Sequence, residues 1–396
     1  MIAPKLRFSE FKDEWFEKKL EEIATVERGK FSPRPRNDPK FYNGEMPFIQ
    51  TGDVANCGIY LEKYTQTLNE EGIKVSKVFP KNSILITIAA NIGDTAITRF
   101  PVACPDSLVA IQPLENIANT HFLNNLLELK KEYLDSQATQ NAQKNINLQV
   151  LKPLELVIPN YQEQTKIAEF LSAVDDKISQ LSRQLELLNQ YKKGVMQKIF
   201  SQEIRFKNDN GEDFGEWDFG ELKKFCVVNP KTEEIPDNFY YVDLESVDSG
   251  RLLHMKKVLK KNSPSRASRV LAKKDILFQT VRPYQQNNFY FNLEGDFVAS
   301  TGYAQIKTEK NNPKFIYYLL HTKSFLDEVL NRCTGTSYPA INGTDLSTIE
   351  VQMPTIQEQK KIAEFLTAID ERIDHTTAQL TYTKQWKKGL LQQMFV

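Results

Sequence analysis

An internal duplication constrains this chain more than any other feature of its sequence. Residues 162–200 align without a gap on residues 357–395, and 20 of the 39 aligned pairs are identical. The similarity continues upstream at the same offset of 195 positions, where Pro159 matches Pro354. The 396 residues therefore form two halves that share one scaffold.

Each repeated segment predicts one long helix. Apolar side chains recur at alternating spacings of three and four residues, interrupted by Lys192, and this is the period of a coiled-coil seam. A helix of 39 residues is roughly 58 Å long at 1.5 Å per residue. The residues expected to pair the two helices are Ile167, Leu171, Val174, Ile178, Leu181, Leu185 and Leu188, with Ile362, Leu366, Ile369, Ile373, Leu380 and Leu390 in the second copy.

The natural partner for each apolar stripe is the stripe of the other copy. If a pseudo-two-fold axis relates the halves, the helices form an antiparallel coiled coil. A second echo supports this, because Arg7-Phe8 before Trp15 resembles Arg205-Phe206 before Trp217. We therefore expect a circular arrangement in which residues 1–20 pack near the end of the second helix. The alternative is a stalk that joins two copies of the chain through the same stripe.

The segments between the helices align poorly, and both contain short β-like runs followed by helical stretches at 121–136 and 313–331. The predicted class is therefore α+β. The runs are 48–50, 83–88 and 108–111 in the first half and 240–242, 276–281 and 303–306 in the second.

Three loops between these runs are rich in side chains that bind bases. Residues 30–36 are basic and contain two prolines, residues 89–95 are small and polar, and residues 281–288 combine an arginine, a tyrosine and four amides. Arginine pairs with guanine and Asn or Gln with adenine, at about 1–3 kcal/mol of discrimination per good pair. Such polar loops are also common on ordinary protein surfaces.

Composition sets further limits. The 51 basic and 51 acidic residues argue weakly against nucleic acid, since phosphate contact normally leaves a basic excess. No stretch is apolar enough to span a membrane, the start lacks a secretory pattern, and the four cysteines form no Cys-x-x-Cys pair. These features favour a cytoplasmic protein without membrane contact.

Signs of catalysis are weak. The chain has no Gly-x-Gly turn for S-adenosylmethionine, and the Asn-Pro pair at 229–230 is followed by Lys231 rather than by a second proline and an aromatic residue. Residues 28–31 lack the spacing of a phosphate-binding loop. Asp106 with Glu128 and Lys130 fits a loose nuclease pattern, but a helix would point Glu128 and Lys130 to different faces. The four histidines show no metal-ligand spacing, so we expect no metal site.

The chain resembles the specificity subunits of Type I restriction–modification systems over nearly its whole length. The resemblance lies in residues 47–54, 275–284 and 335–342, and in the doubled Pro-x-x-Gln-Glu-Gln-x-Lys-Ile-Ala-Glu-Phe-Leu motif. The first half departs from the usual pattern at residues 140–145, where the second half has a glycine-containing loop.

The resemblance implies a non-catalytic subunit that recognises a bipartite double-stranded DNA target, with paired helices that set the unread spacer. Target-recognition domains would occupy residues 1–158 and 204–353, and the conserved helices residues 159–203 and 354–396. Two methyltransferase subunits and the restriction subunits would bind the chain and would supply S-adenosylmethionine, ATP and Mg²⁺. The alternatives are a coiled-coil interaction protein or a stand-alone DNA-modifying enzyme.

The side chains predicted to contact DNA come from these loops and motifs. In the first half they are Lys30, Arg34, Arg36, Gln50, Thr51, Asp53, Asn91, Thr95, Lys144 and Asn145. In the second half they are Gln279, Arg282, Tyr284, Gln285, Gln286, Asn287, Thr336, Ser337 and Tyr338.

Overall fold

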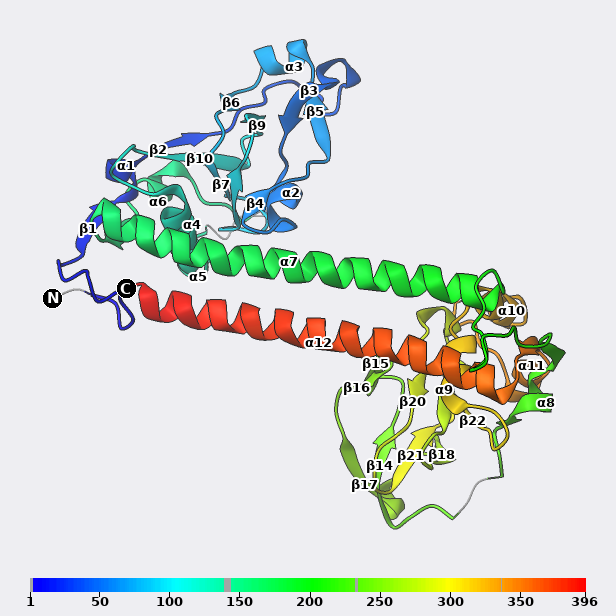
Figure 1. Ribbon diagram of the computed structural model, residues 1–396. Helices are drawn as coiled ribbons and strands as arrows, with labels where there is room; N and C mark the ends of the chain where they lie inside the picture. Colours follow the sequence, from blue (N-terminus) through cyan, green and yellow to red (C-terminus); the bar gives the residue numbers. More distant parts are fainter. Residues whose placement is uncertain (1–2, 139–143, 232–233, 336) are drawn as a thin grey trace. The chain divides into compact units, whose positions relative to one another are not determined.

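The computed structural model describes residues 3–138, 144–231, 234–335 and 337–396, and Figure 1 shows how helices and strands alternate along it. Two helices stand out by length, α7 (Tyr161–Phe200, 40 residues) and α12 (Ile356–Met394, 39 residues), which confirms the two predicted helices. The chain divides into two compact units. The first contains residues 1–184 and 376–396 and the second residues 185–375, so each long helix contributes to both.

The first unit carries two main sheets and a short strand pair. One sheet has the order β2 (Ala24–Arg28), β10 (Leu108–Pro113), β7 (Ile84–Thr87), β8 (Thr95–Thr98), β4 (Tyr60–Leu61). The other has the order β5 (Gln66–Leu68), β3 (Tyr42–Phe48), β9 (Val102–Ala103), β6 (Val78–Phe79), and β1 (Phe16–Lys19) pairs with β11 (Glu155–Ile158). The short helices are α1 (Leu20–Ile23), η1 (Pro39–Phe41), α2 (Thr51–Ala55), α3 (Glu70–Lys74), α4 (Thr120–Leu129), α5 (Lys131–Ser136) and α6 (Leu148–Leu151).

The second unit repeats this strand order, apart from β4, which has no counterpart among the described strands there, although its sequence aligns poorly with the first. Its sheets are β13 (Val227–Val228), β22 (Tyr303–Lys307), β19 (Ile276–Gln279), β20 (Phe289–Tyr290), and β17 (Lys256–Leu259), β14 (Asn238–Val242), β21 (Phe297–Ser300), β18 (Ala267–Val270). Two strand pairs are β12 (Asp218–Glu221) with β23 (Glu350–Met353) and β15 (Val247–Asp248) with β16 (Arg251–Leu252). The short helices are α8 (Leu222–Phe225), η2 (Lys260–Asn262), η3 (Pro283–Gln285), α9 (Pro313–Leu319), α10 (Lys323–Asn331) and α11 (Gly343–Ser347). The α+β class is confirmed.

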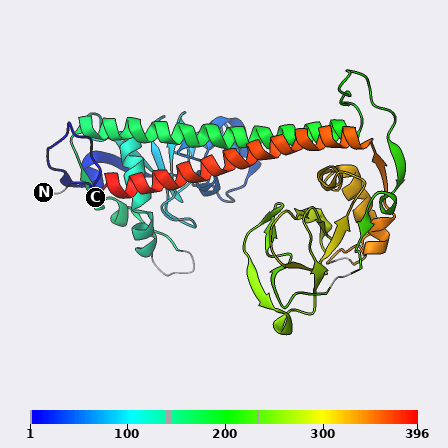
Figure 2. The ribbon, with the colours of Figure 1, turned by 60° about the horizontal axis from the view of Figure 1, so that its bottom comes forward.

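The ends of the long helices are built into the core of each unit. In the first unit, the start of α7 and the end of α12 share one apolar cluster, in which Leu171 lies with Leu390 and with Phe122 of α4. In the second, the end of α7 and the start of α12 share the corresponding cluster, with Ile199, Leu366 and Phe315. Within each unit, therefore, the parts of α7 and α12 that belong to it run antiparallel and lie side by side (Figures 1 and 2).

A buried carboxylate joins each unit's first strand segment to a long helix. Glu163 is fully buried, and Arg7 donates to its two oxygens at 2.7 and 2.8 Å. The indole of Trp15 donates to the same carboxylate at 3.3 Å. Hydrogen bonding to Glu163 raises the pKa of Arg7, so the guanidinium stays charged. Residues before β1 are thus fixed to the start of α7.

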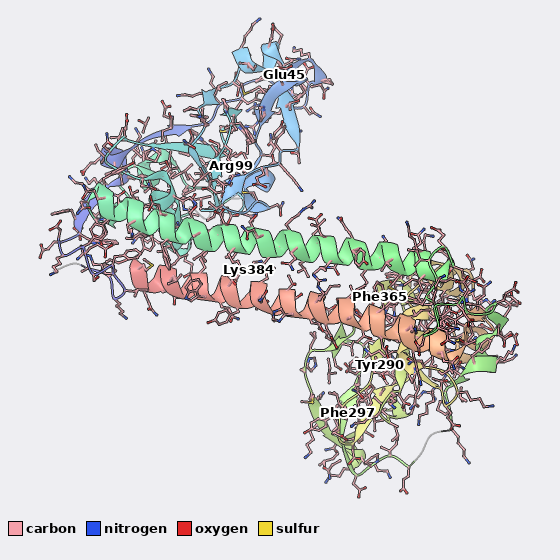
Figure 3. All side chains as sticks on the ribbon, in the orientation of Figure 1. Glu45, Arg99, Tyr290, Phe297, Phe365 and Lys384 are labelled. Carbon is pink, nitrogen blue, oxygen red and sulfur yellow. The ribbon has the colours of Figure 1, made fainter. Side chains whose placement is uncertain are left out.

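The second unit repeats this cluster with Arg205, Glu358 and Trp217. Arg205 donates to Glu358 at 3.1 and 2.7 Å, and Trp217 donates to it at 3.2 Å. In each unit, the phenylalanine that follows the arginine packs against a phenylalanine of a long helix. In the second unit these are Phe206 and Phe365 of α12, whose rings meet edge-on with their centres 5.5 Å apart (Phe365 is labelled in Figure 3). Because Leu6 also donates its backbone N–H to Gln393 at 2.8 Å, both ends of the chain meet in the first unit, which confirms the circular arrangement.

Two ion pairs between the long helices explain the lysine that interrupts the seam. In the second unit Lys192 lies 2.6 Å from Asp370, and in the first Lys387 lies 3.0 Å from Asp175. The two pairs occupy matched positions of the duplication, so both units hold α7 and α12 in the same register. Burial raises the pKa of Asp175 to about 6, against the opposing effect of Lys387. These pairs favour one antiparallel register over others.

Burial along the predicted seam is uneven. The residues toward the helix ends are buried, and so is Leu181 midway along α7, whereas Ile178, Leu185, Leu188, Ile373 and Leu380 are only half-buried. Thr376 replaces an apolar side chain in the same stretch and is buried. Packing is therefore densest where the globular parts cover the helices and thinner midway along them.

Candidate nucleic-acid interface

In the second unit, three strands end at one place. The parallel strands β14 and β21 finish side by side, and the turn Thr301–Gly302 leads from β21 into β22. Thr280, just after β19, donates its N–H to the Gly302 carbonyl at 3.0 Å. We call this place, with the loops that leave it, the loop end of the unit.

The backbone of the loop that follows Thr280 is strained and is held in place by specific contacts. Arg282 has a left-handed conformation (φ 53°), which costs a non-glycine residue about 1–3 kcal/mol and is concentrated at functional sites. Its N–H donates to the Pro339 carbonyl at 2.8 Å, and its guanidinium lies 4.3 Å from the ring centre of Tyr338. The turn η3, which begins with Pro283, then fixes the direction of the loop.

These contacts bring the predicted residues of the second unit together from two separate segments. Tyr284 and Tyr338 are 50% and 65% exposed, so both rings are accessible to a partner. Gln285 and Ser337 are also exposed, while Gln286 and Asn287 are half-buried, and Thr336 lies outside the described residues. The result is an exposed set of two aromatic rings and one amide around a stacked arginine, with two half-buried amides beside them, and these are the side-chain types that base recognition uses.

Gln279 does not belong to this exposed set. It is buried, and its side-chain amide donates to the Val281 carbonyl at 2.8 Å and to Gln285 at 2.8 Å. Its side-chain oxygen accepts from the N–H of Asn287 at 3.0 Å. Since its polar atoms are engaged within the protein, Gln279 shapes the loop and presents no free amide; this corrects its predicted position at the surface.

A half-buried histidine completes the hydrogen-bonded support beneath the loop. His321 bonds the Tyr317 carbonyl through Nδ1 at 2.7 Å, which leaves Nε2 to face the Asn288 amide at 3.4 Å. Asn288 in turn accepts from the N–H of Gln279 at 2.8 Å. Sequence reasoning counted Asn288 among the amides of the 281–288 loop and gave neither Asn288 nor His321 a supporting role, because no periodicity marks a polar residue that faces inward.

Low pH should weaken the hydrogen-bonded support that His321 and Asn288 give to the Arg282 loop. Burial lowers the pKa of His321 to about 4, with Lys192 lowering it further and Asp370 opposing it. The unfolded chain binds a proton near pH 6.5, so stability contributed by neutral His321 is present above that pH and is lost as pH falls toward 4. We expect thermal melts between pH 4 and 8 to show a smaller acid-side decrease in Tm for His321→Gln than for the wild-type chain. Superimposable pH profiles would contradict the role given to His321.

The first unit has an equivalent loop end. Ile88, after β7, donates to the Ser107 carbonyl at 3.1 Å, and Lys30 donates to the Cys104 carbonyl at 2.9 Å. Gly29 makes the second contact possible, because a Cβ atom there would lie 2.2 Å from the Pro105 carbonyl oxygen. The strand end after β3 adds Gln50 and the α2 helix beside it.

One backbone position is conserved in geometry between the loop ends but not in side chain. Ala89 bridges Asn145 as Val281 bridges Ala340, and the next residue in each unit, Ala90 or Arg282, has a left-handed backbone. The first unit therefore presents a methyl group where the second presents a guanidinium. The two loop ends thus share a backbone geometry and differ in the side chain that they present at this position.

The remaining predicted residues of the first unit differ in exposure, and several of them have partners within the protein, as Lys144 does in Asp135 at 3.4 Å. Asp53 accepts from the Gln50 N–H at 2.8 Å and caps α2, and Arg36 pairs with Asp106 at 2.8 Å. Lys30, Arg34, Asn91, Lys144 and Asn145 are exposed, whereas Gln50, Thr51 and Thr95 are half-buried. Residues 140–143, where the first half departs from the family pattern, lie outside the described residues.

Two negative findings concern the described residues only. Within them, no group of three or more His, Cys, Asp or Glu side chains could hold a metal ion. None of the helices seen there is long and apolar enough to cross a membrane.

Comparison with known proteins places this geometry in a family. A family model for the Type I restriction modification DNA specificity domain matches residues 12–190 and again residues 215–382. The chain therefore belongs to this family of DNA specificity proteins, and it contains the domain twice.

Two relatives and one solved structure match most or all of the chain. The chain is 24% identical to the Type I restriction enzyme MjaVIII specificity subunit of Methanocaldococcus jannaschii, over 88% of this chain and 84% of that protein. It is 26% identical to the putative MjaX specificity subunit of the same organism, over 98% and 94%. Its fold is similar to the crystal structure of the S subunit from M. genitalium (TM-score 0.67, 16% identity, 100% and 99% of the two chains).

Proposed function

We propose that this chain is the non-catalytic subunit that recognises a bipartite double-stranded DNA target for a Type I restriction–modification complex. One half-site is recognised by each loop end, and the helices α7 and α12 set the spacer. The observation that carries the proposal is the duplicated scaffold with diverged loop ends, in which Arg282 and Ala90 occupy the same backbone position.

The proposal includes the partners. Matched positions of α7 and α12 expose apolar pairs, Leu187 with Tyr191 (47% and 54%) and Tyr382 with Trp386 (71% and 45%). A surface that occurs twice on one chain suits two copies of one partner, and we assign it to two methyltransferase subunits. S-adenosylmethionine, ATP and Mg²⁺ are then bound by methyltransferase and restriction subunits, and the complex works in the cytoplasm.

The experiment that tests the function is to map methylated adenines in DNA from cells that carry the intact system. We expect two short defined sequences separated by a fixed unread spacer. The purified chain alone, given S-adenosylmethionine and target DNA, should transfer no methyl group. Methyl transfer by the isolated chain, or a methylated site with one undivided sequence, would contradict the proposal.

Arg282→Ala gives a residue-level test of the second loop end. A guanidinium that binds a base edge contributes about 1–3 kcal/mol, so the methyltransferase complex should lose about 5- to 150-fold in affinity for the correct second half-site. Preference at the first half-site should stay unchanged, and Arg282→Lys should recover little because the bidentate geometry is lost. Competition binding with DNA altered in one half-site at a time measures both effects. An equal loss on all sequences would instead make Arg282 a phosphate contact.

A further inference from the structure

The second unit contains a basic segment that the balanced overall charge conceals. Residues 251–274 include nine Lys or Arg residues and no Asp or Glu. In the first unit, the segment that joins the equivalent strands, residues 66–77, has two lysines and two glutamates. There Lys74 pairs with Glu71 at 2.5 Å and Lys77 with Glu27 at 2.7 Å. The two units therefore differ in charge at matched places.

Hydrogen bonds fix the basic segment to both sides of the Arg282 loop. Ser249, just before it, donates its N–H to the Asn287 side chain at 3.0 Å. Toward its other end, the Arg266 carbonyl accepts from Thr301 at 2.9 Å, and Thr301 begins the turn on which Thr280 rests. The segment thus starts and returns beside the second loop end.

The strand register shows which Lys and Arg side chains of the basic segment lie at the second loop end. Lys256 is the first residue of β17 and pairs with Tyr241, one residue before β14 finishes, and Ala267 at the start of β18 pairs with Ser300 at the end of β21. Lys256, Lys257 and Arg266 are exposed, and in the described part of the chain none of them has an acidic partner. By contrast, Arg251, Lys260 and Lys273 form ion pairs with Asp374, Glu234 and Glu294.

We propose that Lys256, Lys257 and Arg266 bind backbone phosphates of duplex DNA beside the half-site recognised by the second unit. The proposal rests on the function proposed above and adds an asymmetry to it. Three exposed cations at the loop end that have no acidic partner among the described residues give the second unit a sequence-independent attraction for DNA that the matched segment of the first unit lacks. The second unit anchors the complex on DNA, and sequence is read from that position.

A competing explanation is protection of a sheet edge. β17 lies at the edge of its sheet, and edge strands are commonly protected from aggregation by lysine. On that explanation, removing Lys256 and Lys257 would promote self-association and leave the salt dependence of DNA binding unchanged.

The test measures DNA affinity of the methyltransferase complex across a salt series. The first variant carries Lys256→Gln, Lys257→Gln and Arg266→Gln. The matched control removes the same charge from the same segment with Lys260→Gln, Lys261→Gln and Lys273→Gln, where η2 follows the opposite end of β17. Thermal melts and light scattering verify that both variants fold and stay dispersed.

We expect the first variant to bind at least ~10-fold more weakly at 0.1 M salt on every DNA sequence, and log K to fall less steeply with log salt by about 2–3. The ratio of target to non-target affinity should not change. The control variant should keep a slope closer to that of the wild type. Equal slopes for the two variants, or self-association of the first without a change in slope, would overturn the proposal while leaving the target recognition of the wild-type complex intact. No target preference in the wild-type complex would instead refute the proposed function, and this inference with it.

Discussion

A heptad inserted at matched points of both long helices should lengthen the DNA target by about three base pairs. The insertion points are immediately before Gln184 in α7 and Gln379 in α12, which the shared register of the two ion pairs places opposite each other. Seven residues preserve the 3.5-residue seam and add about 10 Å of helix at 1.5 Å per residue. At 3.4 Å per base pair this is about three base pairs of spacer.

Methylation mapping measures the result directly. We expect the same two half-sites with a longer gap and no methylation of the original target. The matched control inserts the heptad into α7 alone, which shifts one stripe against the other and should abolish methylation of both targets. A folded double-insertion variant that keeps the original spacer would show that the helices do not set the spacing.

Among the proposed variants, removal of the buried Glu163 carboxylate should cause the largest loss in the free energy of unfolding. Glu163→Ala leaves Arg7 and the Trp15 indole without their acceptor, and breaking a buried pair by removing one partner costs about 3–5 kcal/mol. Because Arg7 is partly exposed, we expect about 3 kcal/mol, measured by denaturant unfolding. Glu358→Ala should destabilise the second unit comparably.

Two further variants make this prediction specific. Lys323→Ala removes an exposed i,i+4 pair with Asp327 and should change stability by less than about 0.5 kcal/mol. Replacing both partners, with Arg7→Leu and Glu163→Leu, should cost less than Glu163→Ala because no unpaired charge remains. A Glu163→Ala variant as stable as Lys323→Ala would show that the cluster contributes little.

The sequence predicted the scaffold well because its information is local or repeated. The 3.5-residue period located α7 and α12, and the doubled Arg-Phe and Trp signals predicted the circular arrangement, whereas the buried acceptor Glu163 emerged only from the structure. The strand order could not be predicted, since pairs such as Tyr240 with Phe297 join residues far apart in the chain. Even Lys192, which interrupts the seam, is explained only when Asp370 lies beside it.

The loop ends show where local reasoning stops. Pro283 restrains the loop after β19, but nothing in the sequence indicates that Arg282 is left-handed or stacks on Tyr338 from another segment. Gln279 illustrates the opposite case. Its residue type suits base contact, yet β19 is buried along its whole length, so strand alternation could not indicate which way the side chain points.

Each long helix carries both halves of the ion pair that joins it to the other. In α7, Asp175 accepts a lysine from α12 and Lys192 reaches an aspartate of α12, and α12 has the same two residues at Asp370 and Lys387. Such a helix is complementary to an antiparallel copy of itself. A gene half as long would therefore encode everything needed for a symmetric homodimer that recognises a palindromic target, and joining two such genes would free each half to evolve its own preference.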